Sequence, residues 1–214
     1  MKILQLCVGM VGTNCYIVYD ETTMLGAVID PGDNAPAILA EIERAGVKVE
    51  WILLTHGHFD HILAVGDVQA ATGARLAIHK DDLWMLTPES LSASMRSFGM
   101  PRSRYTQLQP DLLAEEGSTV EIGGLTAEYL HTPGHTPGSS CIRMGNVLFT
   151  GDTLFRHECG RCDLAGGDFD KMLRSLARLR DLPGDYTVLP GHEATSTLED
   201  ERRWNPYMRQ AGGR

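Results

Sequence analysis

The residues that could do chemistry are concentrated in one short segment, His56-Gly57-His58-Phe59-Asp60-His61. Three histidines and one aspartate lie within six residues, directly after the apolar run Trp51-Ile52-Leu53-Leu54. Because side chains alternate along an extended strand, the first two histidines can point the same way, while the last two ligand-type residues approach from the following turn. Imidazole and carboxylate groups suit zinc, iron and manganese, and no thiolate lies nearby to close a structural zinc site. The segment therefore predicts a metal site that does chemistry.

Three later segments share this design, in which a strand ends in a short loop that carries a ligand-type residue. A Pro/Gly-framed loop carries His135, a strand ending in Gly-Asp carries Asp152, and a strand ending in Pro-Gly-His carries His192. Small residues beside each ligand let the backbone and a metal approach closely. Each segment alone is an ordinary turn, but together with the first cluster they predict one metal centre. His79 and His131 also follow or end strands and are expected to support the fold instead.

The elements that must position these residues can be read from hydrophobic spacing and turn signals. Strands are expected at 2–9, 15–20, 25–30, 49–54, 74–79, 119–122, 125–131, 139–144, 146–150 and 186–189. Helices are expected at 36–45, 61–72, 81–86 (capped by Asp81), 169–182 and 197–208. The segment 87–117 is expected to be a helical insertion or a lid. Strands precede helices in two successive halves, which predicts an α/β fold with a two-sheet core, helices outside it, and chemistry along one edge.

Composition and charge limit the class of protein and the kinds of partner. The chain has 214 residues, of which 43% are hydrophobic and 22% charged, and no linker divides it, so one globular domain over 1–214 is expected. No apolar run reaches about 18 residues and the first residues do not resemble a secretory signal, so neither a membrane segment nor export is expected. A net charge of −9 without a basic cluster argues against nucleic acid as a partner. Five scattered cysteines indicate reduced thiols in the cytoplasm.

The sequence resembles the metallo-beta-lactamase superfamily over nearly its full length. Residues 55–61 match the family's His-x-His-x-Asp-His motif, and the later ligand-type residues follow in the family's order. The resemblance implies a four-layer αββα sandwich with a two-metal site at one edge. It assigns the ligands as follows: His56, His58 and His135 to the first metal, Asp60, His61 and His192 to the second, and Asp152 to a bridging position. It implies zinc as the metal, and the same ligand types accept iron or manganese.

Two such metals would make a serine or cysteine nucleophile unnecessary. Cations about 3.5–4 Å apart lower the pKa of a bridging water towards ~7, so that hydroxide is available at neutral pH. The same cations polarise a carbonyl and stabilise the oxyanion that develops on it. The catalytic carboxylates implied by the resemblance are Asp60 and Asp152, with the metal-activated hydroxide as nucleophile.

Within the superfamily the sequence is more similar to glyoxalase II, the hydroxyacylglutathione hydrolases, and especially to their short bacterial relatives. The matching stretches are 131–139, 151–155, 159–168, 190–193 and 201–206. The reaction implied is hydrolysis of a small thioester such as S-lactoylglutathione. Full-length members bind glutathione through a lysine, two tyrosines and a C-terminal helical domain, whereas the corresponding positions here are Arg161, Asp163 and Ala194. The chain after the last histidine is too short for that domain.

Substrate contacts are expected near the loop that follows the bridging aspartate. Arg161 could meet the glycyl carboxylate of glutathione as a bidentate donor. Arg156 and His157 lie in the same stretch and are further candidates. A monomer and a homodimer are both compatible with the sequence.

Three alternative functions stay open. Antibiotic hydrolysis is disfavoured because true β-lactamases of this fold usually lack the Asp60 equivalent and are exported. Persulfide dioxygenases share the fold and a Cys-Gly-Arg-x-Asp loop, and would use one iron on His56, His135 and Asp152. A redox-sensing protein would use the thiols of the Cys-x-x-Cys motif at 159–162.

Overall fold

The computed structural model describes residues 1–90 and 107–211 and contains two six-stranded mixed sheets. The strands of the first sheet, in spatial order, are β1 (Lys2–Val8), β2 (Thr13–Tyr19), β3 (Leu25–Ile29), β4 (Lys48–Leu53), β5 (Arg75–His79) and β6 (Leu112–Ala114). The first three strands pair antiparallel, and β3 to β6 run parallel. The carboxyl ends of these parallel strands therefore lie at one edge of the sheet.

The second sheet delivers strand ends to the same region. Its strands, in spatial order, are β14 (Ser196–Thr197), β13 (Thr187–Pro190), β10 (Val147–Gly151), β9 (Ser140–Met144), β8 (Leu125–His131) and β7 (Thr119–Ile122). Strands β10 and β13 are parallel, and β8 and β10 run the same way because both are antiparallel to β9. A small hairpin of β11 (Leu154–Phe155) and β12 (Glu158–Cys159) follows β10.

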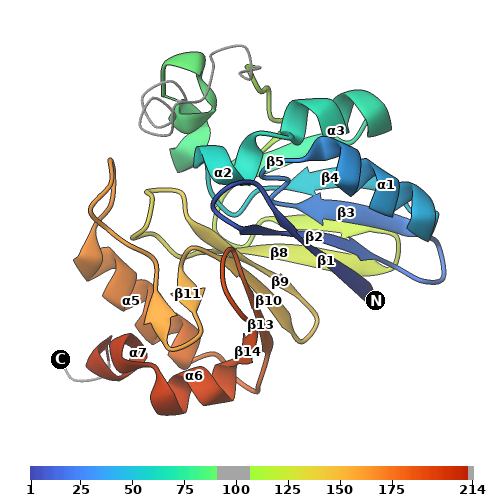
Figure 1. Ribbon diagram of the computed structural model, residues 1–214. Coiled ribbons are helices and arrows are strands. Elements are labelled where there is room, and N and C mark those ends of the chain that lie inside the picture. Colours follow the sequence, from blue (N-terminus) through green and yellow to red (C-terminus); the bar gives the residue numbers. More distant parts are fainter. Residues whose placement is uncertain (91–106, 212–214) are drawn as a thin grey trace.

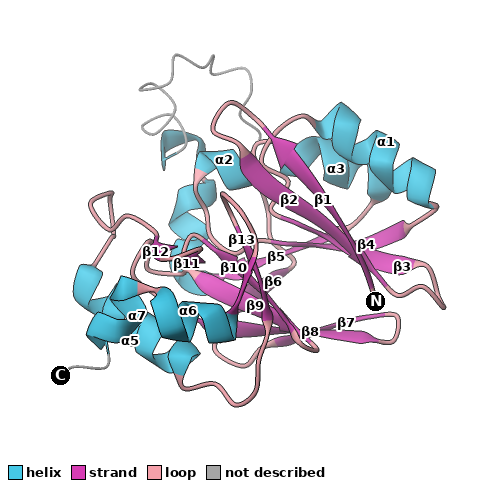
Figure 2. Ribbon diagram, turned by 60° about the horizontal axis from the view of Figure 1, so that its bottom comes forward, coloured by secondary structure: helices cyan, strands magenta, loops and turns pink. Residues whose placement is uncertain are grey.

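Helices cover the outer face of each sheet (Figures 1 and 2). The first half contributes α1 (Ala35–Ala45), α2 (Phe59–Ile62), α3 (Val65–Thr72) and the 3₁₀ helix η1 (Lys80–Leu86). The second half contributes α5 (Phe169–Arg180), α6 (Leu198–Trp204) and α7 (Pro206–Ala211). The expected four-layer αββα sandwich is thus confirmed.

The layers follow from strands that are apolar on both faces. In β2, Cys15 and Ile17 pack towards α1 and α3, whereas Tyr16 and Val18 pack between the two sheets. The ring of Tyr16 meets that of Phe149 from β10 edge-on in this central layer, with centroids 5.3 Å apart. A third cluster packs the outer face of the second sheet against α5, α6 and α7. Strands buried on both sides read as continuous apolar runs, which is why alternation is weak in this sequence.

The long helices begin and end at residues with clear local signals. Pro36 lies in the first turn of α1, and Gly46 ends that helix in the left-handed conformation, with φ of 67°. Asp168 caps α5 by accepting a hydrogen bond from the Lys171 amide at 3.0 Å. Helix α5 buries Met172 and the leucines that follow at helical spacing, and so covers the second sheet.

Three expected helices differ in detail. The helix expected at 61–72 is two helices, α2 and α3, because the chain turns at Ala64, whose amide donates to the Pro31 carbonyl at 3.0 Å. The short helix at 81–86 is a 3₁₀ helix that His79 caps, since the Nδ1 atom of His79 accepts from the Asp81 amide at 3.3 Å. The C-terminal helix breaks at Asn205, before Pro206.

The segment 87–117 is not simply a helical insertion or a lid. Its described part contains β6, a three-residue edge strand that pairs with β5. Residues 91–106 lie outside the described residues. Strands β11, β12 and β14 were not expected either, because two-residue strands are defined by their partners and leave no hydrophobic pattern.

Hydrogen bonds tie the two sheets together at the edge where the strands end. The Ser140 amide donates to the Thr55 carbonyl at 2.9 Å. The Tyr16 hydroxyl donates to the Pro190 carbonyl at 2.7 Å, and the Asn14 side chain donates to the carbonyls of Pro190 and Glu193, each at 3.0 Å. Loops from both sheets are therefore held in a fixed relation around this edge.

Within the described part of the chain, none of the helices combines the length and apolar character needed to cross a membrane.

The central layer between the sheets should dominate stability. We expect Phe149→Ala to lower the free energy of unfolding by about 3–5 kcal/mol, because the ring is fully buried and its loss leaves a cavity. Phe169→Ala is the matched control, since that ring is 42% exposed, and it should cost about 0.5 kcal/mol. Equal shifts in the urea midpoint of the two variants would contradict this assignment of the core.

Candidate metal centre

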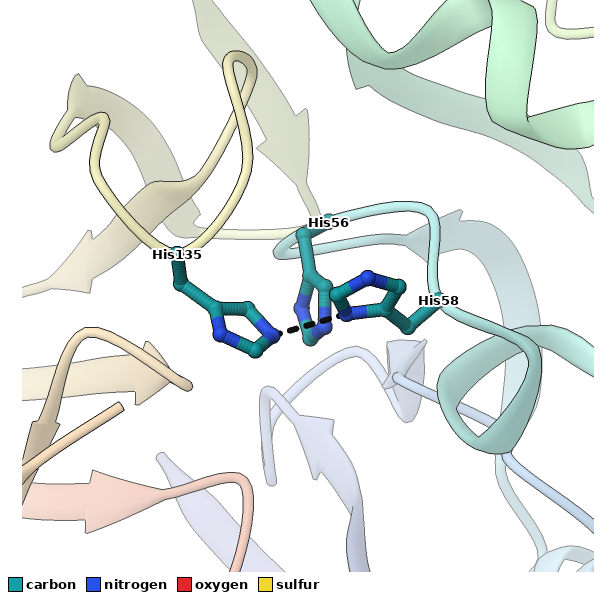
Figure 3. A group of neighbouring side chains, drawn as sticks. All are labelled: His56, His58 and His135. Atoms are coloured by element: carbon teal, nitrogen blue, oxygen red, sulfur yellow. Dashed lines mark hydrogen bonds between the residues drawn. The ribbon is translucent and has the colours of Figure 1, made fainter. Parts of the chain in front are cut away.

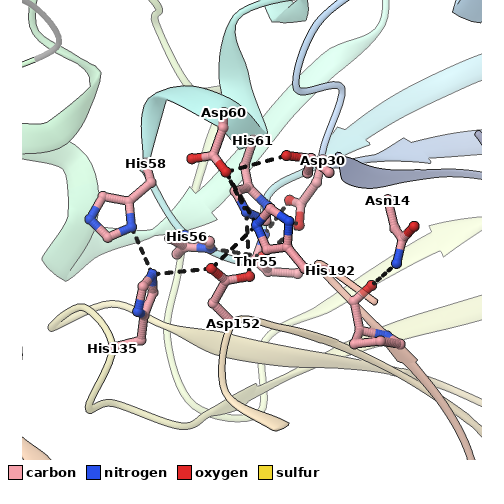
Figure 4. A network of polar contacts seen from close by, with 12 residues as sticks. Asn14, Asp30, Thr55, His56, His58, Asp60, His61, His135, Asp152 and His192 are labelled. Atoms are coloured by element: carbon pink, nitrogen blue, oxygen red, sulfur yellow. Dashed lines mark hydrogen bonds and ion pairs between the residues drawn. The ribbon is translucent and has the colours of Figure 1, made fainter. Parts of the chain in front are cut away.

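The seven side chains expected to hold metal meet at the edge where both sheets end (Figure 4). The loop after β4 and the start of α2 supply four of them, and the loops after β8, β10 and β13 supply one each. Parallel strands from two sheets thus bring together residues that are up to 136 positions apart, as His56 and His192 show.

The first ligand set consists of His56, His58 and His135 (Figure 3). Their side chains are 1%, 9% and 2% exposed. The Nδ1 atom of His58 lies 2.7 Å from the Nε2 atom of His135, and the ring of His56 lies edge-on to both, with centroids 4.9 and 4.8 Å away. Three imidazoles therefore point nitrogen atoms into one buried space.

The second ligand set consists of Asp60, His61 and His192. The Oδ2 atom of Asp60 lies 3.2 Å from the Nε2 atom of His192 and 3.6 Å from that of His61. His61 is fully buried, whereas the side chains of Asp60 and His192 are partly exposed. This set therefore lies nearer the surface than the first.

Asp152 lies between the two sets. Its Oδ2 atom is 3.4 Å from the Nε2 atom of His135 in the first set and 3.6 Å from that of His192 in the second. Its Oδ1 atom is 3.4 Å from the Nε2 atom of His61. One carboxylate thus reaches both sets, as a bridging ligand must.

The donor set fits a cation better than it fits itself. Among the described side chains, the Nε2 atoms of His56 and His61 and the Oδ1 atom of Asp152 are buried and have no hydrogen-bond partner. Buried polar atoms without partners cost free energy, and atoms that converge without hydrogens between them are the usual signature of a metal site. The residue types are those preferred by zinc, iron and manganese.

Each imidazole is oriented by an acceptor at its other nitrogen. His61 Nδ1 lies 3.0 Å from the Oδ2 atom of Asp30, and His135 Nδ1 lies 2.8 Å from the Arg161 carbonyl oxygen. His56 Nδ1 lies 3.1 Å from the Thr55 hydroxyl, which itself donates to Asp30 at 2.6 Å. These contacts direct the Nε2 atoms of His56, His61 and His135 into the centre.

Asp30 is a functional residue that the sequence did not reveal. It follows β3 and accepts hydrogen bonds from the amide and the hydroxyl of Thr55, as well as facing His61. The stretch Asp30-Pro31-Gly32-Asp33 reads as a turn, because nothing local shows that its first carboxylate is buried at 2% exposure. Its place after a strand that ends beside β4 was the available signal.

The two ligand sets differ in charge. Burial, and then the neighbouring His61, lowers the pKa of His56 well below its usual range. Burial and His135 lower the pKa of His58 to about 3. Burial alone would also lower the pKa of His61, but the charges of Asp60, Asp152 and Asp30 outweigh it and raise that pKa well above the usual value. Without metal, the first set is therefore neutral and His61 carries a proton.

The residues expected to contact substrate lie on the surface beside the centre. Arg156 and His157 are exposed at the tip of the β11–β12 hairpin, and the neighbouring Phe155 ring lies 6.1 Å from that of His192. The Arg161 side chain is 64% exposed and forms a bidentate pair with Asp163, at 2.6 and 2.7 Å.

The other histidines support the loops. His131 Nε2 lies 2.8 Å from the Pro137 carbonyl oxygen, and the buried His79 ring stacks on it with centroids 4.0 Å apart and an interplanar angle of 12°. The in-plane nitrogens of parallel stacked rings do not converge on one point, so this pair is a poor metal site even with Asp81 close by. His79 and His131 thus have the supporting contacts expected of them.

The thiols of Cys159 and Cys162 are poorly suited to redox sensing. Burial and the adjacent thiol raise the pKa of Cys159 to about 12, and burial raises that of Cys162 to about 11. The thiolate is the reactive form, so both groups are largely unreactive at neutral pH.

The close approach of Gly191 to the centre provides a test of its packing. A Cβ atom at this position would lie 2.4 Å from Asp152 Oδ1 and 2.7 Å from His61 Cε1. We expect Gly191→Ala to lower bound metal, measured by plasma emission after dialysis, because the methyl group displaces both ligands. Gly184→Ala is the control, since a methyl group there meets open space. Equal metal content in the two variants would contradict the predicted arrangement.

The charge difference between the sets predicts a pH dependence of metal binding. Burial would lower the pKa of His192, but its hydrogen bond with Asp60 and the Asp152 charge raise it, as the carboxylates do for His61. A cation that binds the second set must displace these protons, so its affinity should rise as pH rises from 6 to 8. The first set, already neutral, should depend less on pH. Calorimetric titration in buffers of different ionisation enthalpy measures the protons released, and release confined to the first binding event would refute the prediction.

Comparisons with known proteins agree with this geometry. The metallo-beta-lactamase superfamily profile matches residues 8–192. The chain is 32% identical over 200 residues to hydroxyacylglutathione hydrolase GloC of Haemophilus influenzae, covering 91% of this chain and 92% of that protein. The solved structure of BLEG-1 B3 metallo-beta-lactamase is similar at a TM-score of 0.89 and 34% identity, covering 97% and 99% of the two chains. TTHA1623 in a di-iron-bound form is similar at a TM-score of 0.83 and 34% identity, covering 95% and 99%. The chain belongs to the metallo-beta-lactamase superfamily and is a metal-binding hydrolase of that fold.

Proposed function

We propose that this protein is a binuclear metal-dependent thioester hydrolase that acts on hydroxyacylglutathione substrates of the S-lactoylglutathione type. The observation that carries the proposal is the position of Asp152, whose two oxygens reach both ligand sets at 3.4–3.6 Å. The relative named hydroxyacylglutathione hydrolase supports the choice of substrate class.

The proposed ligands are the seven residues of the two sets and the carboxylate between them. His56, His58 and His135 would hold the first cation, Asp60, His61 and His192 the second, and Asp152 both. Zinc is the proposed metal. Iron and manganese suit the same donors, and the similar structure in a di-iron-bound form supports iron as the next choice.

The chemistry divides between the metals and the chain. When bound, the cations supply an activated water and a Lewis acid for the thioester carbonyl. Asp60 and Asp152 offset the charge of the cations, and His61 holds the pKa of Asp152 well below its usual range against the opposing effect of burial. Asp152 therefore stays ionised and cannot act as a general acid. A thioester does not need one, because its thiol leaving group has a pKa of about 8.5 and departs as a thiolate.

The loop 156–163 is the proposed substrate side. We propose that Arg161 exchanges Asp163 for the glycyl carboxylate of glutathione, since an exposed ion pair contributes little free energy and is readily replaced. Arg156 and His157 would contact the same end of the substrate from the hairpin tip. The cytoplasm is the proposed location, and the five free cysteines support a reducing compartment.

The proposal is tested by thiol release from S-lactoylglutathione, with protein reconstituted separately with zinc and with iron. We expect metal-dependent turnover that falls by about 10²–10³-fold or more in Asp152→Ala, because that variant loses the carboxylate that both ligand sets share. Bound metal should fall in the same variant. Asp67→Ala is the control, since that carboxylate is exposed on α3, and it should keep both metal and rate.

The other outcomes separate the alternatives. Full metal occupancy and full rate in Asp152→Ala would refute the bridging assignment. No thiol release from fully metallated protein would exclude this substrate. Iron-dependent oxygen uptake with glutathione persulfide would then point to a dioxygenase using His56, His135 and Asp152. Nitrocefin hydrolysis would point to the activity named for the similar B3 metallo-beta-lactamase structure.

A further inference from the structure

We infer that Asp82 is a positioning residue for the first ligand set, because its buried carboxylate holds the loop of His56 and His58 against the loop of His135. The inference rests on the metal centre proposed above but not on the substrate. Asp82 lies in η1 at 0% exposure and belongs to neither ligand set.

The carboxylate accepts three hydrogen bonds from two separate loops. Its Oδ2 atom accepts from the Gly57 amide at 3.1 Å and from the Thr136 hydroxyl at 2.7 Å. Its Oδ1 atom accepts from the Gly138 amide at 2.6 Å. Gly57 lies between His56 and His58, and Thr136 directly follows His135. One side chain therefore sets the spacing of all three imidazoles.

Glycine positions show independently that the two loops are built to receive this residue. A Cβ atom at Gly138 would lie 2.7 Å from both the Cγ atom and the amide nitrogen of Asp82. A Cβ atom at Gly57 would lie 2.6 Å from the Cβ atom of Met85, one turn further along η1. Both loops thus approach η1 more closely than any residue with a side chain allows.

The chemistry of the site requires a carboxylate and not an amide. Both oxygens act as acceptors, and all three donors are uncharged. An asparagine would keep the shape but would turn an NH₂ group towards an amide or a hydroxyl that also donates. A buried carboxylate with only neutral donors is costly, and bound cations at the adjacent His135 would offset that cost. Asp82 and the first cation are therefore expected to stabilise each other.

The second ligand set is braced by other residues. The Thr13 hydroxyl lies 3.2 Å from the Oδ2 atom of Asp60, and Asp30 faces His61 at 3.0 Å. The hydrogen bonds of the Asp82 carboxylate go to Gly57, Thr136 and Gly138, which lie in the loops of the first set. Loss of Asp82 should therefore affect one cation much more than the other.

The experiment is a cobalt(II) titration of the full chain, read by visible absorption and by competition with a chelator. Asp82→Asn should weaken one of two binding events by about 10–100-fold, as outer-layer partners of metal ligands do, and change its absorption spectrum. Thr136→Val, which removes a single donor, should weaken the same event less. Thr13→Val should weaken the other event. A carboxylate that merely stabilised the fold would not produce this separation.

Two controls keep the result decisive. Glu201→Gln changes another carboxylate at 0% exposure, which accepts the His157 amide at 2.8 Å, and it should lower stability without altering either cobalt event. If Asp82→Asn does not fold, Thr136→Val decides alone. Unchanged cobalt binding in the folded Asp82→Asn, equal weakening of both events, or no effect of Thr136→Val on its event would overturn the inference.

The outcome can be separated from that of the proposed function. Wild-type protein that binds cobalt at two sites but releases no thiol from thioesters would refute the substrate and leave Asp82 as inferred, provided the variants separate. Turnover in the wild type with unchanged cobalt binding in Asp82→Asn would do the reverse. Wild-type protein that takes up no cobalt would overturn both.

Discussion

Buried lone pairs that face one another are the constraint on which this structure depends. Nitrogen and oxygen atoms from four loops point into one space, and His56, His61 and Asp152 each have a buried atom without a hydrogen-bond partner among the described residues. Such an arrangement opposes folding unless a cation fills it. The rest of the site holds these atoms in place from behind, through Asp30, through Thr55 and through backbone carbonyls.

The fold meets this constraint by directing strand ends from two sheets to one edge. Each ligand loop follows a strand that is buried on both faces, so the backbone that carries the ligand has little freedom to move away. Hydrogen bonds across the edge, such as that of the Ser140 amide with the Thr55 carbonyl, fix the sheets relative to each other. Metal-binding geometry is thus a property of how the layers pack, more than of any one loop.

The layers and the ligand residues could be predicted from the sequence because their signals are local. A strand followed by ligand-type residues beside glycine is visible in a short stretch, as around His135 and His192. Asp30 and Asp82 could not be found in this way, because their roles are defined by donors 25 to 56 residues away in the chain. Strand β6 exists through its pairing with β5, and the break between α2 and α3 depends on a contact with Pro31. These features arise from tertiary structure, which local patterns do not encode.

The hydrogen bonds from Asn14 and Tyr16 to Pro190 and Glu193 have a consequence for how the protein is made. They join residues 174 to 179 positions apart, and the last ligand, His192, lies between their acceptors. During synthesis the second strand waits for its partner until almost the whole chain has left the ribosome. Contacts of such sequence separation form late, because a long loop must close before they can contribute. The nascent protein therefore cannot complete its metal centre until its C-terminal part has folded against its beginning.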